Sequence, residues 1–171
     1  MDKHTTKNFK ETQELGQNFA RGILAAKPQT LWRGSGQAAV VLALRGDLGA
    51  GKTTFLQGFA KGLGIEEVVN SPTFVILKRF MISATSSLRS APRGAWRGSP
   101  KFKNFYHIDC YRLEKPEEIL QLSFEEIISS PENIIAIEWP EKIKGLLPPK
   151  IISIDFNHLK ENKREIIINN A

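Results

Sequence analysis

The sequence predicts a three-layer α/β fold, in which a partly parallel sheet with antiparallel ends is flanked by helices. A continuous apolar run at 38–44 is typical of a strand covered on both faces, and a glycine loop and a helical pattern follow it directly. A second fully apolar run lies at 134–137. Strands and helices alternate early in the chain, whereas the late strand patterns at 151–156 and 165–168 are joined by a polar turn.

The remaining elements follow from the spacing of apolar residues. Residues 11–26 repeat apolar side chains every three or four positions and precede a proline, which predicts a helix. Further helices are expected at 52–62 and 116–128, and further strands at 74–80 and 105–109. The helix at 116–128 begins with a proline and two glutamates, which favour a helix N-terminus.

Length and composition favour one domain in the cytoplasm. A chain of 171 residues is the size of one ordinary domain, so we expect a single domain over 1–171. Cys110 is the only cysteine, so no intramolecular disulfide can form, as is usual in reducing cytoplasm. No run approaches the roughly 18 apolar residues of a membrane span, and the first dozen residues show no export signal. We therefore expect no membrane association.

The positive charge is concentrated in one segment. The formal net charge is +6, yet residues 78–103 alone carry seven basic residues and no acidic one, so the rest of the chain is close to neutral. Residues 81–104 are rich in Ser, Arg, Gly and Pro and follow no period, so we expect a mobile basic insertion that adds nothing to the core. It is either an incidental solvated loop or a surface that faces RNA.

A phosphate-binding loop is the strongest functional signal. Residues 46–53 read Gly-Asp-Leu-Gly-Ala-Gly-Lys-Thr and match G-x-x-x-x-G-K-[ST] at every fixed position. Gly51 lets backbone amides turn toward phosphate oxygens, Lys52 supplies a cation for the β and γ oxygens, and Thr53 offers a hydroxyl to Mg²⁺. The chain is therefore expected to bind a nucleoside triphosphate with Mg²⁺ on a P-loop NTPase-like sheet.

Two carboxylates stand where hydrolysis needs a second acid. Glu138 ends one apolar strand and Asp109 ends another, and such strand ends commonly hold Mg²⁺ or orient water. We favour Glu138 as the acid on the metal side, because a carboxylate in that apolar setting would otherwise be costly to bury. Asp109 is left with three alternatives: an outer metal contact, activation of water, or pairing with Arg112.

Three further side chains have two readings each. His107 lies in a strand two residues before Asp109 and is interpreted as a core or half-exposed imidazole rather than a catalytic one, so no role is assigned to it. Trp139 could stack on a base or a partner, or could pack internally. Thr73 could sense the γ-phosphate from a loop, or could be an ordinary threonine at a strand edge.

Four motifs in order resemble the bacterial TsaE (YjeE) family. They are the phosphate loop through Thr54, Ser-Pro-Thr-Phe at 71–74, His-Ile-Asp-Cys-Tyr-Arg-Leu at 107–113 and Glu-Trp-Pro at 138–140; residues 11–16 also resemble the family's first helix. The resemblance implies a small ATPase that works with the TsaB and TsaD proteins, and through them with tRNA, to make N6-threonylcarbamoyladenosine at position 37. The family joins the strands around 81–101 by a short hairpin, so this chain departs from it there.

The resemblance also implies site roles. Lys52, Asp109 and Glu138 would be catalytic, and Thr53 and Glu138 would hold Mg²⁺. With Trp139 added for its possible stacking, the residues expected to contact ATP are Thr12, Asp47, Leu48, Gly49, Ala50, Gly51, Lys52, Thr53, Thr54, Trp139 and Arg164.

Rival functions share the phosphate loop. A small-molecule or nucleoside kinase would need an acceptor pocket and often a basic lid, for which only the 81–104 segment could serve. A GTP-dependent switch normally reads guanine with Asn-Lys-x-Asp, which this sequence lacks. A nucleotide that only holds a complex together would differ from an ATPase by the absence of turnover.

Overall fold

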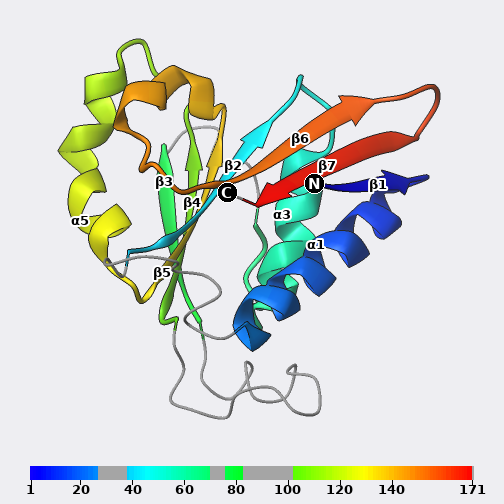
Figure 1. Cartoon of the computed structure of the whole chain (residues 1–171), viewed down its shortest axis with the longest axis horizontal. Helices are drawn as coiled ribbons and strands as arrows, with labels where there is room; N and C mark the ends of the chain where they lie inside the picture. Colours follow the sequence, from blue (N-terminus) through cyan, green and yellow to red (C-terminus); the bar gives the residue numbers. More distant parts are fainter. Residues whose placement is uncertain (27–37, 70–75, 83–101, 171) are drawn as a thin grey trace.

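The computed structural model describes residues 1–26, 38–69, 76–82 and 102–170. Within these residues the strands form one seven-stranded sheet in the order β1-β7-β6-β2-β5-β4-β3 (Figure 1). The strands are β1 (Asp2–Thr6), β2 (Val40–Arg45), β3 (Leu77–Met81), β4 (Asn104–Asp109), β5 (Asn133–Glu138), β6 (Ile152–His158) and β7 (Arg164–Asn170).

The centre of the sheet is parallel and both ends are antiparallel. Strand β2 lies between β5 and β6 and runs parallel to both, and β4 continues the parallel part beside β5. At the ends, β3 pairs antiparallel with β4, β7 with β6, and β1 with β7. The structure thus confirms the predicted fold class and the central position of the 40–44 strand.

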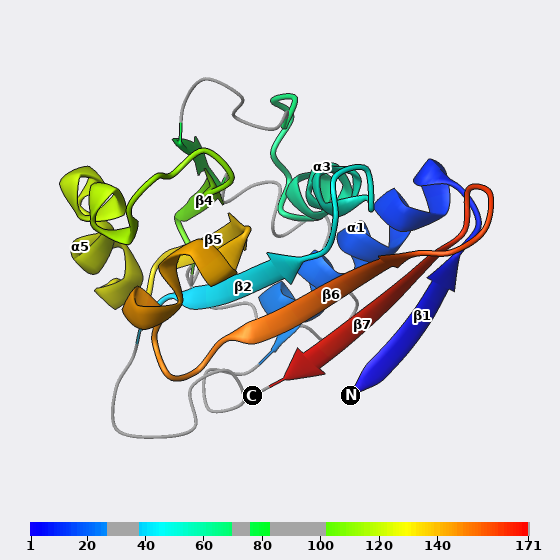
Figure 2. The same cartoon turned by 90° about the horizontal axis from the view of Figure 1, so that it is seen from above.

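Helices cover both faces of the sheet. The long helices α1 (Phe9–Ala25) and α3 (Lys52–Gly62) lie side by side on one face, whereas η1 (Pro116–Leu122), α5 (Phe124–Ser129) and η2 (Pro140–Leu146) belong to the opposite face (Figure 2). Strand β2 contributes side chains to both cores. Leu42 and Leu44 belong to the apolar cluster under α1 and α3, and Val41 belongs to the cluster on the opposite face of the sheet. Two cores on one sheet make the three layers.

Glycines set the close approach of α1 to α3. A Cβ at Gly16 would collide with the backbone oxygen of Phe55, and one at Gly58 would collide with that of Gln13. Because neither glycine carries a Cβ, the two helix backbones lie almost in contact. This packing holds α3, and therefore the loop that precedes it, firmly against the rest of the fold.

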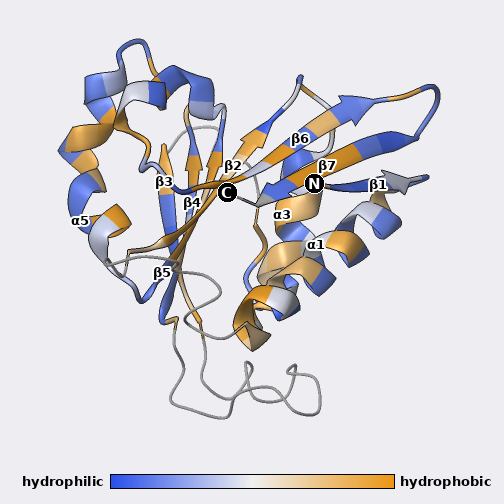
Figure 3. Cartoon of the chain, in the orientation of Figure 1, coloured by the Kyte–Doolittle hydropathy of each residue, from blue (hydrophilic) through white to orange (hydrophobic). Residues whose placement is uncertain are grey.

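Strand β1 was not predicted. Its residues Asp2–Thr6 are polar, and only Thr6 is buried, so no apolar alternation marks a strand. Figure 3 shows β1 mostly in hydrophilic colours, in contrast to the hydrophobic β2. The strand forms because the edge of β7 offers backbone partners, a reason that a sequence pattern does not contain.

Two further predictions need correction. The helix expected at 116–128 is broken at Ser123, whose φ of 55° lies in the left-handed region, into the 3-10 helix η1 and the short helix α5. The 81–104 segment was expected to add nothing to the core, but Ile82 and Phe102 are buried in it, and Met81 and Asn104 pair in the β3–β4 ladder. These four residues are hairpin ends, and residues 83–101 between them lie outside the described part.

No helix in the described part of the chain is long and apolar enough to span a membrane.

The predicted strand at 74–80 is observed as β3 from Leu77, and its first two residues fall in the undescribed segment 70–75. Thr73 and the rest of the Ser-Pro-Thr-Phe motif at 71–74 also lie outside the described residues, so the role predicted for Thr73 stays a prediction.

Candidate functional site

The phosphate loop leaves the carboxyl end of β2 and leads directly into α3. Three of its glycines have positive φ: 135° at Gly46, 78° at Gly49 and 106° at Gly51. Such angles suit glycine, and they let the loop fold back over the end of the strand. Gly51 is the N-cap of α3 and offers no side-chain hydrogen bond, so the amides of the first helical turn are left for an anion.

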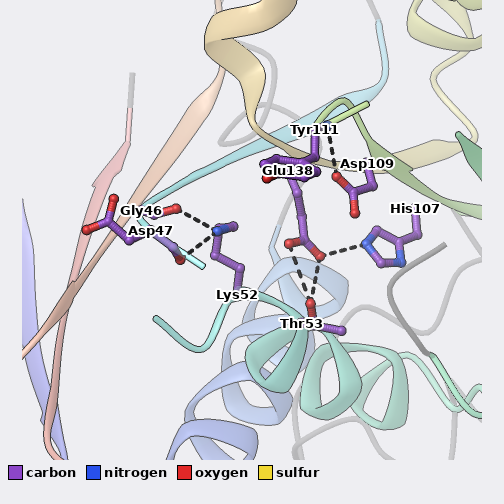
Figure 4. Close-up of polar contacts among 8 residues, drawn as sticks. All are labelled: Gly46, Asp47, Lys52, Thr53, His107, Asp109, Tyr111 and Glu138. Atoms are coloured by element: carbon purple, nitrogen blue, oxygen red, sulfur yellow. Dashed lines mark hydrogen bonds and ion pairs between the residues drawn. The ribbon is translucent and has the colours of Figure 1, made fainter. Parts of the chain in front are cut away.

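Lys52 lies inside this loop. Its ammonium group donates hydrogen bonds to the carbonyl oxygens of Gly46, at 2.6 Å, and Asp47, at 3.0 Å (Figure 4). It also lies over the ring of Trp139, 4.3 Å from the centroid. Burial lowers the pKa of Lys52 from its usual value, while nearby acids, Glu138 first among them, oppose that shift. The cation is held by the backbone rather than by a carboxylate partner.

Thr53 and Glu138 meet next to the loop. The Thr53 hydroxyl donates to the Glu138 carboxylate, 3.1 Å from Oε1 and 3.5 Å from Oε2. Glu138 ends β5, where it is in register with Leu44, the last residue but one of β2, and the residue is only 3% exposed. The hydroxyl and the carboxylate expected to hold Mg²⁺ are therefore brought together by neighbouring parallel strands (Figure 4).

Asp109 stands beside Glu138. The two residues are register partners at the ends of β4 and β5, so their side chains project from the same face of the sheet. One oxygen of Asp109 accepts a hydrogen bond from the Tyr111 amide at 3.0 Å. The structure places the second acid at the same edge as the first.

His107 is a residue whose position sequence reasoning undervalued. It was interpreted as a core or half-exposed imidazole without a role, and it is fully buried. Its Nε2 atom, however, lies 2.9 Å from Oε1 of Glu138. The signal that could have found this contact is the i, i+2 spacing from Asp109, which puts both side chains on one face of β4.

Trp139 turns the chain immediately after Glu138. Its φ of 58° is unusual for a bulky residue and costs free energy, which the surrounding contacts must offset. Its ring centroid lies 5.2 Å from that of Tyr111, and the same ring contacts the ammonium of Lys52. The ring of Trp139 thus packs on Tyr111 and Lys52 within the site, and its stacking on a base or a partner stays a prediction.

Thr12 and Arg164 flank the loop from other elements. A Cβ built on Gly51 would lie 2.8 Å from Cδ of Arg164 and 3.8 Å from Cγ2 of Thr12. The Thr12 hydroxyl is turned away, because it contacts the Thr6 hydroxyl at 2.8 Å and the Asn8 carbonyl at 3.1 Å. Only the methyl of Thr12 faces the loop, whereas the guanidinium stem of Arg164 lies against Gly51.

The other predicted contact residues belong to the loop or the first turn of α3. Asp47, Leu48 and Gly49 are exposed, Ala50 is buried and donates its amide to the Asp47 carbonyl at 3.2 Å, and Thr54 is half-buried. Among these residues, the Asp47 carbonyl accepts a hydrogen bond from the Lys52 ammonium. The Leu48 side chain is 68% exposed.

The residues present suit a magnesium nucleotide. Mg²⁺ in proteins commonly takes one or two carboxylates and completes its shell with phosphate oxygens and water. Within the described residues no group of three or more His, Cys, Asp or Glu side chains could hold a metal alone. Thr53 and Glu138 would therefore supply only part of a magnesium ligand set, and phosphate oxygens and water would have to supply the rest.

Comparisons with known proteins agree on one family. Residues 6–166 match the family described as "Threonylcarbamoyl adenosine biosynthesis protein TsaE". A tRNA threonylcarbamoyladenosine biosynthesis protein TsaE from Rickettsia prowazekii is 36% identical over 162 residues, covering 94% of this chain and 90% of that protein. The protein of that name from Bacillus subtilis is 36% identical over 126 residues, covering 74% of this chain and 66% of its own.

A solved structure is similar along the whole chain. The crystal structure of YdiB from Bacillus subtilis has a TM-score of 0.62 and 28% sequence identity, and the match covers 99% of this chain and 84% of that one. The similarity extends well beyond the phosphate loop.

Proposed function

The chain belongs to the TsaE family, and we propose that it is a Mg²⁺-dependent ATPase that acts with TsaB and TsaD in the biosynthesis of tRNA N6-threonylcarbamoyladenosine. The names of its relatives support the pathway. One observation carries the biochemical part: Thr53 at the start of α3 and Glu138 at the end of β5 share a hydrogen bond beside a phosphate loop that encloses Lys52. That convergence is what ATP hydrolysis at a P-loop requires.

The loop and Lys52 would bind the triphosphate. The amides at the start of α3 have no side-chain cap and would donate to an anion, and the helix dipole favours negative charge there. The Lys52 ammonium can exchange its carbonyl partners, Gly46 and Asp47, for the β and γ oxygens without leaving the loop. Arg164 lies against Gly51, and we include it as a further positive charge near the phosphates.

Glu138 and Asp109 would have different roles in hydrolysis. Bound Mg²⁺ would neutralise charge on the transferring phosphate, with Thr53 and Glu138 as its protein ligands. Asp109 would orient the attacking water, and its contact with the Tyr111 amide and its register with Glu138 support this role. Trp139 covers the Lys52 ammonium and limits its exposure to solvent, which strengthens electrostatic contacts at the site.

The decisive experiment is ATP hydrolysis by the purified chain, alone and with TsaB and TsaD from the same organism. We expect weak turnover alone and stimulation by the two partners together, with complete dependence on Mg²⁺. Formation of threonylcarbamoyladenosine on tRNA in the reconstituted mixture, lost when this chain is omitted, tests the pathway. ATP binding without hydrolysis in the full mixture would contradict the ATPase assignment and leave a purely structural role for the nucleotide.

The kinase alternative gains no support from the described residues. Its lid would have to be the basic segment, and 83–101 of that segment lie outside the described residues. Transfer of labelled γ-phosphate to small-molecule acceptors, rather than to water, would distinguish the two activities.

A further inference from the structure

The strongest feature that the proposed chemistry leaves unused is the contact between His107 and Glu138. His107 lies in the middle of β4 with none of its surface exposed, and its Nε2 atom is 2.9 Å from Oε1 of Glu138, which is itself 3% exposed (Figure 4). An ionised carboxylate only accepts hydrogen bonds, so Nε2 must carry the hydrogen. The contact therefore fixes the tautomer of His107.

The surroundings show that the ring is directed at this one partner. His107 is in register with Ala136, whose small side chain leaves room for the imidazole to reach past it to Glu138, two residues further along β5. No group in the described part of the structure hydrogen-bonds to Nδ1 of His107. Neighbouring residues of β4 and β5, Phe105, Ile134 and Ala136, belong to an apolar cluster, and a polar ring buried there requires a hydrogen-bond partner.

Two donors from different elements contact the Glu138 carboxylate. His107 approaches Oε1 from β4, and the Thr53 hydroxyl approaches the same oxygen from α3 at 3.1 Å and Oε2 at 3.5 Å. If Thr53 turns to Mg²⁺, the His107 N–H is the contact that keeps the carboxylate in place and leaves Oε2 directed toward the loop. A buried carboxylate without such a donor would have no contact to fix its orientation.

We propose that His107 is a positioning residue, which holds Oε1 of Glu138 through its Nε2–H and thereby orients the carboxylate for Mg²⁺. This inference rests on the proposed function, because it concerns the metal that accompanies the nucleotide. Hydrogen bonds to the groups that hold a metal commonly change its affinity by about 10- to 100-fold when removed. Removing the N–H should therefore lower the affinity for Mg²⁺ without lowering the affinity for the nucleotide itself.

The test compares His107→Gln with His107→Asn in the full-length chain. Both amides are polar and smaller than imidazole, but only glutamine extends far enough to place an N–H near the position of Nε2. Binding of a fluorescent, non-hydrolysable ATP analogue is measured in EDTA and over a Mg²⁺ titration, so the readout is independent of turnover. Asn133→Leu is the matched control, since Asn133 is also a buried polar residue of the sheet and bonds to the Ile127 carbonyl away from the site.

We expect His107→Asn to raise the half-saturating Mg²⁺ concentration about 10-fold or more, with affinity in EDTA unchanged. His107→Gln should stay within about 3-fold of the wild type, and Asn133→Leu should lower the melting temperature without moving the Mg²⁺ titration. In a Glu138→Gln background, His107→Asn should have no further effect on Mg²⁺, because the two residues act through one contact.

Other outcomes would overturn the proposal. Equal shifts in Gln and Asn variants, an unmoved titration in His107→Asn, or a loss of affinity in EDTA that parallels a lower melting temperature would each assign His107 a role in packing only. If nucleotide binding by the wild type does not depend on Mg²⁺, the metal part of the proposed function is wrong instead. The two failures are therefore distinguishable in one data set.

Discussion

The ammonium of Lys52 donates a hydrogen bond to the carbonyl oxygen of Gly46, the first residue of the same loop, across 2.6 Å. A second bond to Asp47 and the ring of Trp139 complete its surroundings. The loop thus closes around its own cation, at the place where a motif of this kind binds β and γ phosphates. Binding of a triphosphate must exchange these contacts, and the energetic gain should depend on the γ-phosphate.

Lys52→Ala should weaken ATP binding more than ADP binding. The variant removes a charge-assisted contact of about 1.5–3 kcal/mol, or roughly 10- to 150-fold, and most of that contact is expected on the β and γ oxygens. Isothermal titration calorimetry with both nucleotides measures the difference. Lys61→Ala, an exposed lysine in the last turn of α3, is the control and should change neither affinity. Equal losses for ADP and ATP would show that Lys52 is not directed at the terminal phosphate.

Replacing residues 83–101 by a short Asn-Gly turn should leave folding and ATP binding intact. The sequence of this segment lacks periodic apolar residues, and its flanks already form hairpin ends, because the Ile82 amide donates to the Lys103 carbonyl at 2.8 Å. The deletion must spare Ile82 and Phe102, which are buried in the core. Circular dichroism melting and nucleotide titration check the prediction. A large fall in ATP affinity would support a lid and revive the kinase alternative.

The sequence predicted the parts of the fold that long apolar runs and glycines determine. Residues 40–44 had no polar face, so the central position of β2 followed from solvent exclusion alone, and the loop followed from fixed glycine positions. The sequence did not predict strand β1 or the helix break at Ser123, because β1 depends on pairing with β7 and the break depends on a single left-handed residue. The pairing of β1 is a tertiary effect that overrides local propensity.

The site was predictable as two separate halves but not as one network. Strand-end acids and the loop could be read locally, whereas the contact from Thr53 to Glu138 joins residues 85 positions apart. His107 was undervalued for the same reason: only the β4–β5 register brings its ring toward Glu138. The orientation of Thr12, with its hydroxyl on Thr6, likewise depends on the unpredicted β1.

Cys110 should make the fold sensitive to alkaline pH. Burial, with a smaller contribution from Asp109, raises the pKa of its thiol from 9.0 to about 12. Between these values the unfolded thiol ionises and the folded thiol does not, so the folded state binds more protons and the free energy of unfolding falls as pH rises. The loss approaches 1.4 kcal/mol per pH unit at most, or roughly 2 kcal/mol from pH 9 to 10.5.

Urea unfolding of the wild type and of Cys110→Ala at pH 8 and pH 10.5 isolates this contribution. Ionisation of other groups affects both proteins alike and cancels in the difference between them. We expect the stability advantage of the wild type to shrink by about 2 kcal/mol at the higher pH. A difference that stays constant across this range would mean that Cys110 ionises in the folded state nearly as it does when unfolded.

Glu138→Gln should separate binding from turnover. The amide keeps the size of the side chain but loses the charge proposed to hold Mg²⁺, and it presents a mixed donor and acceptor to Thr53 and His107, which both contact Oε1 in the wild type. Loss of a charge-assisted contact of about 2–3 kcal/mol in the transition state corresponds to roughly 30- to 150-fold in rate. ATP affinity should fall less, because the loop amides and Lys52 remain.

Asp109→Asn is the matched comparison, since Asp109 and Glu138 are register partners on adjacent strands and project from the same face. We expect it to lower turnover while leaving the Mg²⁺ dependence of binding near that of the wild type, because Asp109 is assigned to water and not to the metal. Hydrolysis with TsaB and TsaD and Mg²⁺-dependent nucleotide binding are measured for both variants. If Asp109→Asn shifts the Mg²⁺ dependence and Glu138→Gln does not, the two acids have exchanged roles, and Asp109 is the metal-side carboxylate.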